Sequence, residues 1–257
     1  MVFPITGCVT LYKPNAIHSP LVKEKGDLNT GVSIGASGSG LYNLQAAYAP
    51  SDNIGIMLDG MHHKRRLSGA DSSVQTLNIF FGETGVGYFS RFGDKKNGLF
   101  QCYGGAGYGK STDKITRLHE GNDEMSAKYF NIFIQPGIAL TRKNFELAFD
   151  LRANYVNLFN IRSPLYDKFE WWNTDFRSHS DTSLYFINLE PTLTMKAGGK
   201  KLKGIVQLGL TIPSVNPNSY FIVDTYSLLG FPLIKFSFGL NYYFGRFTLR
   251  PDPEHSP

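Results

Sequence analysis

The stretch that decides the fold is Lys235–Phe244, with the sequence KFSFGLNYYF. Successive side chains of a β-strand point to opposite faces, so this stretch presents two different faces. One face is apolar and aromatic, with Phe236, Phe238, Leu240, Tyr242 and Phe244; the other is small or polar, with Lys235, Ser237, Gly239, Asn241 and Tyr243. Such a strand suits a barrel wall that separates lipid from a polar lumen.

The same alternation recurs along most of the chain. It is longest in Phe145–Tyr155, where apolar residues oppose Glu146, Asp150, Arg152 and Asn154. That length exceeds the ~5–6 residues of a typical strand in a soluble protein. Together the patterns predict ten strands, at residues 31–37, 42–49, 54–62, 74–92, 99–110, 129–140, 145–155, 184–196, 204–212 and 235–244.

The connections between these strands alternate between short and long. Short turns are expected at Pro50, Gly93, Arg142 and Gly198, and long polar loops at residues 63–73, 111–126, 161–181 and 213–232. Short periplasmic turns and long extracellular loops are typical of outer-membrane barrels. The sequence therefore predicts an all-β protein, an antiparallel transmembrane β-barrel of about ten strands (8–10). Pro136 and Pro191, inside expected strands, should each mark a bulge or a local bend.

Composition agrees with this fold class. Of the 257 residues, 14% are aromatic and 18% charged, and no apolar run approaches the ~20 residues of a spanning helix. A membrane protein of this kind must be a barrel or be lipid-anchored. The net charge of +5 has no dense basic block beyond Lys64-Arg65-Arg66, so nucleic acid is not an expected partner.

Several segments carry a resemblance to a known family. Ser237–Phe244 resembles the C-terminal targeting signal of outer-membrane barrels, although Gly245–Pro257 follows it, and Phe3–Cys8 looks like the end of a bacterial lipoprotein signal. With the glycine–aromatic runs at residues 85–89 and 103–109, the chain resembles small outer-membrane β-barrel proteins of Gram-negative bacteria, particularly Bacteroidota-type barrels with a lipoprotein leader. The resemblance implies an outer-membrane location and a lipid attached at Cys8.

The expected organisation follows from that resemblance. Residues 1–29 form a truncated lipoprotein-signal-like leader and a linker, residues 30–246 the barrel, and residues 247–257 a flexible tail. No acidic cluster follows Cys8, so by resemblance the anchor would stay on the periplasmic leaflet. No disulfide is expected between Cys8 and Cys102, because one lies near the N-terminus and the other in an expected strand.

Two groups of charged residues are candidate functional residues. The lumen charges are Glu83, Glu146, Asp150, Arg152, Glu190 and Lys196, which could line a selective pore or fill a narrow barrel with ion pairs. A barrel of about ten strands favours the second interpretation. The basic rim is His62, His63, Lys64, Arg65 and Arg66, expected to attract the phosphates of lipopolysaccharide.

Other motifs predict no chemistry. Gly104–Ser111 matches the Gly-x4-Gly-Lys-Ser pattern of a phosphate-binding loop, but it lies inside an expected strand with no helix after it, so no nucleotide is expected. Adjacent His62 and His63 point to opposite faces and cannot easily share a metal ion. No spacing selects a catalytic residue, a metal site or a cofactor. His119, His179, Trp171 and Trp172 lie in expected loops.

Three functions stay open at this point. The first is a structural or accessory subunit of a cell-envelope assembly, with outer-membrane lipids, lipopolysaccharide and other envelope proteins as partners. The second is a small pore or a ligand-binding transport barrel, using the lumen charges and the long loops. The third is a lipid-modifying outer-membrane enzyme, for which the sequence identifies no catalytic set.

Overall fold

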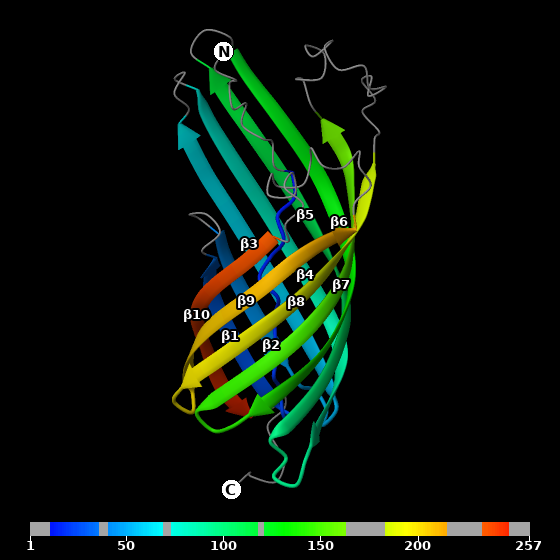
Figure 1. Ribbon diagram of the computed structural model, residues 1–257, viewed down its shortest axis with the longest axis vertical. Helices are drawn as coiled ribbons and strands as arrows, with labels where there is room; N and C mark the ends of the chain where they lie inside the picture. Colours follow the sequence, from blue (N-terminus) through cyan, green and yellow to red (C-terminus); the bar gives the residue numbers. More distant parts are fainter. Residues whose placement is uncertain are drawn as a thin grey trace, which may run out of the picture.

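The computed structural model describes residues 11–35, 41–68, 73–117, 121–162, 183–214 and 233–246. These residues form a closed barrel of ten antiparallel strands (Figure 1). The strands are β1 (Asp27–Gly35), β2 (Leu41–Tyr48), β3 (Ile54–Ser68), β4 (Val74–Phe92), β5 (Gly98–Arg117), β6 (Gly121–Thr141), β7 (Phe145–Arg162), β8 (Leu184–Gly198), β9 (Leu202–Ser214) and β10 (Leu233–Arg246). The predicted fold class is confirmed. The described residues contain no helix long and apolar enough to cross a membrane.

The ring is closed by pairing of the first strand with the last. In β1 and β10, Val32 lies opposite Leu240 and Ile34 opposite Phe238. Every other strand pairs with its neighbours in sequence, so the topology is a simple meander without an edge. The short turns near Pro50, Gly93, Arg142 and Gly198 share one end of the barrel, here named the turn end, and the opposite end is named the loop end.

The wall is apolar outside and polar inside, the reverse of a soluble protein. Outward side chains such as Ile134, Ile138 and Leu240 are more than half exposed. Buried inward side chains include Gln101, Asn131, Asn154 and many others of the same polar kind. An exposed apolar surface that surrounds the whole barrel far exceeds the patches of soluble monomers, and it fits a surface that meets lipid.

Two expectations about the strands are wrong in detail. Residues 63–68 and 111–117 were expected in loops, but they continue β3 and β5, so β3–β6 reach beyond the shorter β1 and β2 at the loop end (Figure 1). At Pro136 and Pro191 the expected bulge is absent, and the alternative, a local bend, stays a prediction. Pairing with one neighbouring strand lapses at each proline, but the register is the same on both sides of it. In β6 and β7, Ile134 lies opposite Ala153 and Gly137 opposite Asp150. In β8 and β9, Leu189 lies opposite Ile212 and Thr192 opposite Gly209.

The glycine-rich run of β5 makes room for large side chains inside the barrel. Gly105, Gly107 and Gly109 face inward, and a Cβ on Gly109 would lie 2.2 Å from the ring of Tyr129. The run is paired on both sides, to β4 and to β6, with its backbone extended. Residues 104–111 therefore form barrel wall and have no phosphate-binding loop geometry.

This packing predicts opposite outcomes for two adjacent glycines. In Gly105→Ala the new Cβ would lie 2.2 Å from the backbone oxygen of Thr84, so we expect a loss of about 1–3 kcal/mol in unfolding free energy. In Gly104→Ala the nearest atom is 3.7 Å away, and the change should stay within about 0.5 kcal/mol. The measurement is urea unfolding in detergent, followed by the gel mobility of the folded band. Equal stabilities would contradict the packing described here.

Candidate functional site in the barrel lumen

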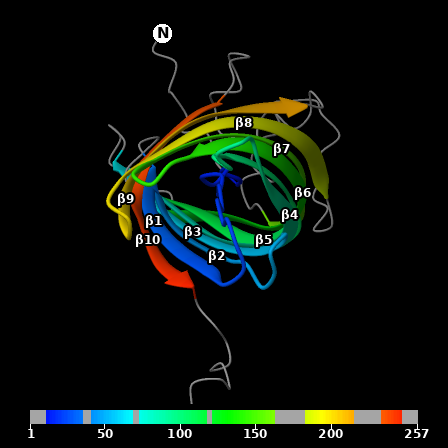
Figure 2. The ribbon, with the colours of Figure 1, turned by 90° about the horizontal axis from the view of Figure 1, so that it is seen from below.

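The lumen is occupied by the chain's own N-terminal segment, residues 11–23, here named the lumen segment. Seen along the barrel, the segment lies inside the ring of strands (Figure 2). Leu11, Ile17 and Leu21 are completely buried, and His18 and Ser19 are 2% exposed. A linker was expected here; the structure places residues 11–23 of it inside the barrel, and β1 begins at Asp27, earlier than expected.

In chain order the lumen segment runs from the loop end, at Leu11, to the turn end, at Lys23. At the turn end Leu21 packs with Phe89 and Ala148, and just after the segment the Gly26 amide donates to the Ala49 carbonyl at 2.8 Å. At the loop end, Leu11 packs in a cluster with Val156 and other residues. Ala148 and Val156 are eight residues apart on β7, which corresponds to about 26 Å along the strand.

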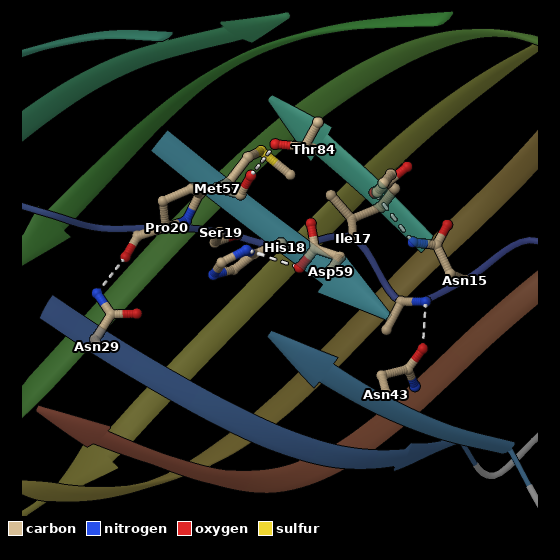
Figure 3. A network of polar contacts seen from close by, with 12 residues as sticks. Asn15, Ile17, His18, Ser19, Pro20, Asn29, Asn43, Met57, Asp59 and Thr84 are labelled. Atoms are coloured by element: carbon tan, nitrogen blue, oxygen red, sulfur yellow. Dashed lines mark hydrogen bonds and ion pairs between the residues drawn. The ribbon is translucent and has the colours of Figure 1, made fainter. Parts of the chain in front are cut away.

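Side chains of the wall bind the backbone of the lumen segment (Figure 3). Five carbonyls accept hydrogen bonds: that of Asn15 from Lys235 at 3.3 Å, of Ile17 from Gln207 at 2.6 Å, of His18 from Gln135 at 2.7 Å, of Ser19 from Lys196 at 2.9 Å, and of Pro20 from Asn29 at 2.8 Å. Three amides donate, Ala16 to Asn43, Leu21 to Gln101 and Lys23 to Asp27. An extended peptide with prolines cannot satisfy its own backbone, so the wall supplies the partners that burial requires.

The segment also brings positive charge to carboxylates of the wall. His18 Nδ1 lies 2.9 Å from Asp59 Oδ1 on β3, with both groups buried (Figure 3). Lys23 binds Glu146 of β7, and the Ser19 hydroxyl donates to Asp150 of the same strand. Among the described residues, Asp59 faces His18 of the segment, so the wall depends on the segment for the partner of this carboxylate.

The deepest ion pair joins Glu83 of β4 to Arg152 of β7. Arg152 donates from Nη1 to Glu83 Oε1 at 2.8 Å and from Nη2 to Oε2, in a bidentate arrangement. Its guanidinium lies 3.8 Å from the centroid of the Phe133 ring. Asn15 and Asn131 donate to the same carboxylate at 3.2 and 3.3 Å. A buried charge pair needs this degree of hydrogen bonding to offset its desolvation.

A second cluster of charges lies nearer the turn end, around Glu146. Its carboxylate accepts from Lys23 of the lumen segment, from Lys203 of β9 at 2.9 Å, and from the Tyr243 hydroxyl of β10. Lys203 and Lys23 also face the ring of Tyr243, at 4.9 and 5.5 Å from its centroid. This cluster holds the segment where it enters the barrel.

The six lumen charges of the sequence analysis all lie on the inner wall and are at most 3% exposed. They form separate groups: Glu83 with Arg152, Glu146 with Lys23 and Lys203, and Glu190 with Lys235 at 3.3 Å. Asp150 accepts from Gln101 at 2.8 Å, and Lys196 donates to Asn241 at 2.7 Å. The barrel therefore arranges them around the segment and leaves no continuous row of free charges.

Sequence reasoning missed several charged wall residues, among them Asp59, Lys203 and Lys235. Asp59 and Lys235 lie on the polar side of an expected strand, so the alternation could have identified them, whereas Lys203 lies just before the expected strand at residues 204–212. For the lumen segment the sequence offered no such signal. Leu11, Ile17, Leu21 and Val22 have no common period, and Pro14 and Pro20 argue against a helix or a central strand.

The basic rim does not form one surface. His62, Lys64 and Arg66 point outward, whereas His63 is completely buried and Arg65 shares its inward face. The His62 ring stacks on Phe80 with centroids 4.2 Å apart, and its Nε2 lies 3.0 Å from Asn78 Oδ1. Among the described residues, no group of three or more His, Cys, Asp or Glu side chains could hold a metal ion.

The expected lipid attachment at Cys8 and its place on the periplasmic leaflet stay predictions. Cys8, His119, His179, Trp171 and Trp172 lie outside the described residues.

Comparisons with known proteins add little. No family model matches the chain, and no curated protein matches it. Among solved structures, CarO2 and CarO of Acinetobacter baumannii are 10% and 11% identical, with 85% and 84% of this chain and 98% and 97% of theirs covered. Their TM-scores are 0.33 and 0.31. At such values the likeness carries no functional argument, and the fold rests on the strand pairing itself.

The buried pair of Glu83 and Arg152 gives a prediction for stability. Arg152→Met leaves the Glu83 carboxylate buried without its cation, so we expect a loss of about 3–5 kcal/mol in unfolding free energy. The double variant Glu83→Gln/Arg152→Met removes both charges and should recover most of that loss. Urea unfolding of both variants in detergent is the measurement. A double variant no more stable than the single one would contradict a paired role.

Proposed function

We propose that this protein is an outer-membrane barrel that works as a small gated conduit, closed at rest by its own lumen segment. The observation that carries the proposal is residues 11–23 lying inside the polar lumen, bound by wall side chains. The apolar outer wall and the alternation of short and long connections support the outer-membrane location and its orientation, with the turn end in the periplasm.

The bonding between wall and segment suits displacement. Several contacts join a wall side chain to a backbone carbonyl, and water or a polar solute can replace such bonds. If the segment moves out, these same amide and ammonium groups line an open path. Ten strands lie between the eight-stranded barrels filled by side chains and the sixteen-stranded porins, so the path is narrow.

The charges point to the class of solute. The lumen segment places His18 against Asp59 and Lys23 against Glu146, which makes it a cationic occupant of a site with buried carboxylates. When it leaves, both carboxylates lose a basic partner. We therefore expect the open path to favour small polar solutes with positive charge over anions.

A structural or accessory subunit of an envelope assembly is the second candidate. The specific observation in its favour is the density of buried ion pairs, because a lumen filled this way needs no opening. In that case the segment stabilises the barrel permanently. Lipid attachment at Cys8 is compatible with either function.

The first functional prediction concerns a reversible lock. The hydroxyls of Ser19 and Thr194 lie 3.1 Å apart, so Ser19→Cys/Thr194→Cys should form a disulfide between segment and wall. In a background with Cys8→Ser and Cys102→Ser, we expect planar-bilayer conductance of the reduced protein and its loss on oxidation. The control is Ser19→Cys alone, which should not respond to oxidation.

Two outcomes would decide between the candidates. Cation-selective openings that disappear on oxidation support the gated conduit. A protein that stays silent when reduced, even at high voltage, contradicts the conduit and favours the structural subunit.

The second functional prediction concerns the side from which the segment is reached. We expect Val9→Cys, in the same cysteine-free background, to react with a membrane-impermeant maleimide on intact cells, because the segment ascends toward the loop end. A thiol introduced at Lys143, in a short turn, should react only after the outer membrane is permeabilised. Labelling of the Val9→Cys protein that also needs permeabilisation would contradict the proposed orientation.

A further inference from the structure

Five basic side chains gather on the outside of the barrel, near the loop end. They are Lys64 and Arg66 of β3, Lys110 and Lys114 of β5, and Lys128 of β6, here named the outer basic cluster; all five are exposed. Along each strand they follow directly on the apolar belt: Tyr108 precedes Lys110, and Phe130 follows Lys128, on the same outward faces. Three of them, on β5 and β6, were absent from the expected basic rim.

Among the described residues, the protein offsets only part of the charge of the cluster. Lys110 lies directly opposite Lys128 in the β5–β6 ladder, and like charges in that position are destabilising. Among the described residues, the ion pairs that form involve none of the five cations. Glu124, which lies opposite Lys114, is the outward-facing carboxylate among the described residues of β3, β5 and β6. An anion bound between the strands would relieve the repulsion.

An apolar groove begins beside the cluster, on the lipid-facing side. Its volume is about 680 Å³, and its outward lining includes Ile34, Leu44, Phe80 and Phe238. Gly60 opens its floor, because a Cβ added there would meet nothing within 4 Å. The groove crosses β10, β1, β2, β3 and β4, and its lining includes His62, the outward residue that precedes Lys64 on β3.

We propose that the groove and the outer basic cluster together bind lipopolysaccharide, with an acyl chain in the groove and phosphate groups on the cluster. The proposal rests on the outer-membrane orientation proposed above, which places the loop end in the outer leaflet. Lysine and arginine near a membrane surface each contribute about 1 kcal/mol toward anionic lipids. Toward the loop end, the apolar groove is followed by the cationic cluster. This order matches a lipid whose phosphate groups lie directly next to its acyl chains.

The experiment measures binding of purified lipopolysaccharide to the full-length protein in a non-ionic detergent, by titration and by the lipid retained after purification. The charge variant is Lys64→Gln/Lys110→Gln/Lys128→Gln, and its matched control is Lys143→Gln/Lys200→Gln/Lys201→Gln in the turns. The groove variant is Gly60→Leu, matched by Ala153→Leu on the outward face of β7. Heat-shifted gel mobility checks that each variant is folded.

The expected result is a loss of about fivefold in affinity per lysine removed, so about a hundredfold for the charge variant, with no change in its control. Gly60→Leu should weaken binding and Ala153→Leu should not. Dephosphorylated lipopolysaccharide should bind wild type as weakly as the charge variant binds the intact lipid.

Other results would overturn the proposal. The specific site would be contradicted if wild type and the charge variant bound lipopolysaccharide with equal affinity. It would also be contradicted if wild type bound phosphatidylglycerol and lipopolysaccharide equally well. Because binding is measured in micelles, it does not depend on opening of the lumen. A failure here leaves the gated conduit standing, and silent bilayers leave this site standing.

Discussion

A sheet in hydrocarbon cannot leave backbone groups unpaired, and this constraint shapes the whole molecule. Closure between β1 and β10 removes the edges, and closure turns one face of every strand inward. The outward face must then be apolar, and the inward face becomes a confined space lined with polar groups. Each buried charge in that space needs a partner.

The lumen segment meets part of this requirement. Wall residues bind its carbonyls, and its own His18 and Lys23 face wall carboxylates. The relation is mutual, because a proline-containing peptide without secondary structure could not be buried without these donors. Barrel and segment therefore stabilise each other, and the same contacts that close the lumen are the ones that must break for it to open.

The strands themselves could be predicted from the sequence, and so could most inward residues. Glu146, Asp150 and Arg152 alternate with apolar neighbours on one strand, so their common face follows from geometry alone. Their ion-pair partners do not follow from the geometry of one strand. Arg152 meets Glu83, which is 69 residues away, and the choice depends on barrel size and strand stagger. The ends of β3 and β5 were expected in loops, because the part of a strand that extends beyond the membrane is polar and resembles a loop in composition.

Sequence by itself determined the ten strands, the lipid-facing side of each and the end at which the short turns lie, because a period of two is a local property of the chain. Tertiary structure alone decided what fills the lumen. The contacts of the lumen segment join residues 131 and 190 positions apart, such as Ser19 with Asp150 and Ile17 with Gln207. A segment without a period carries no local sign of burial, and only closure of the wall around it creates the donors that hold it there.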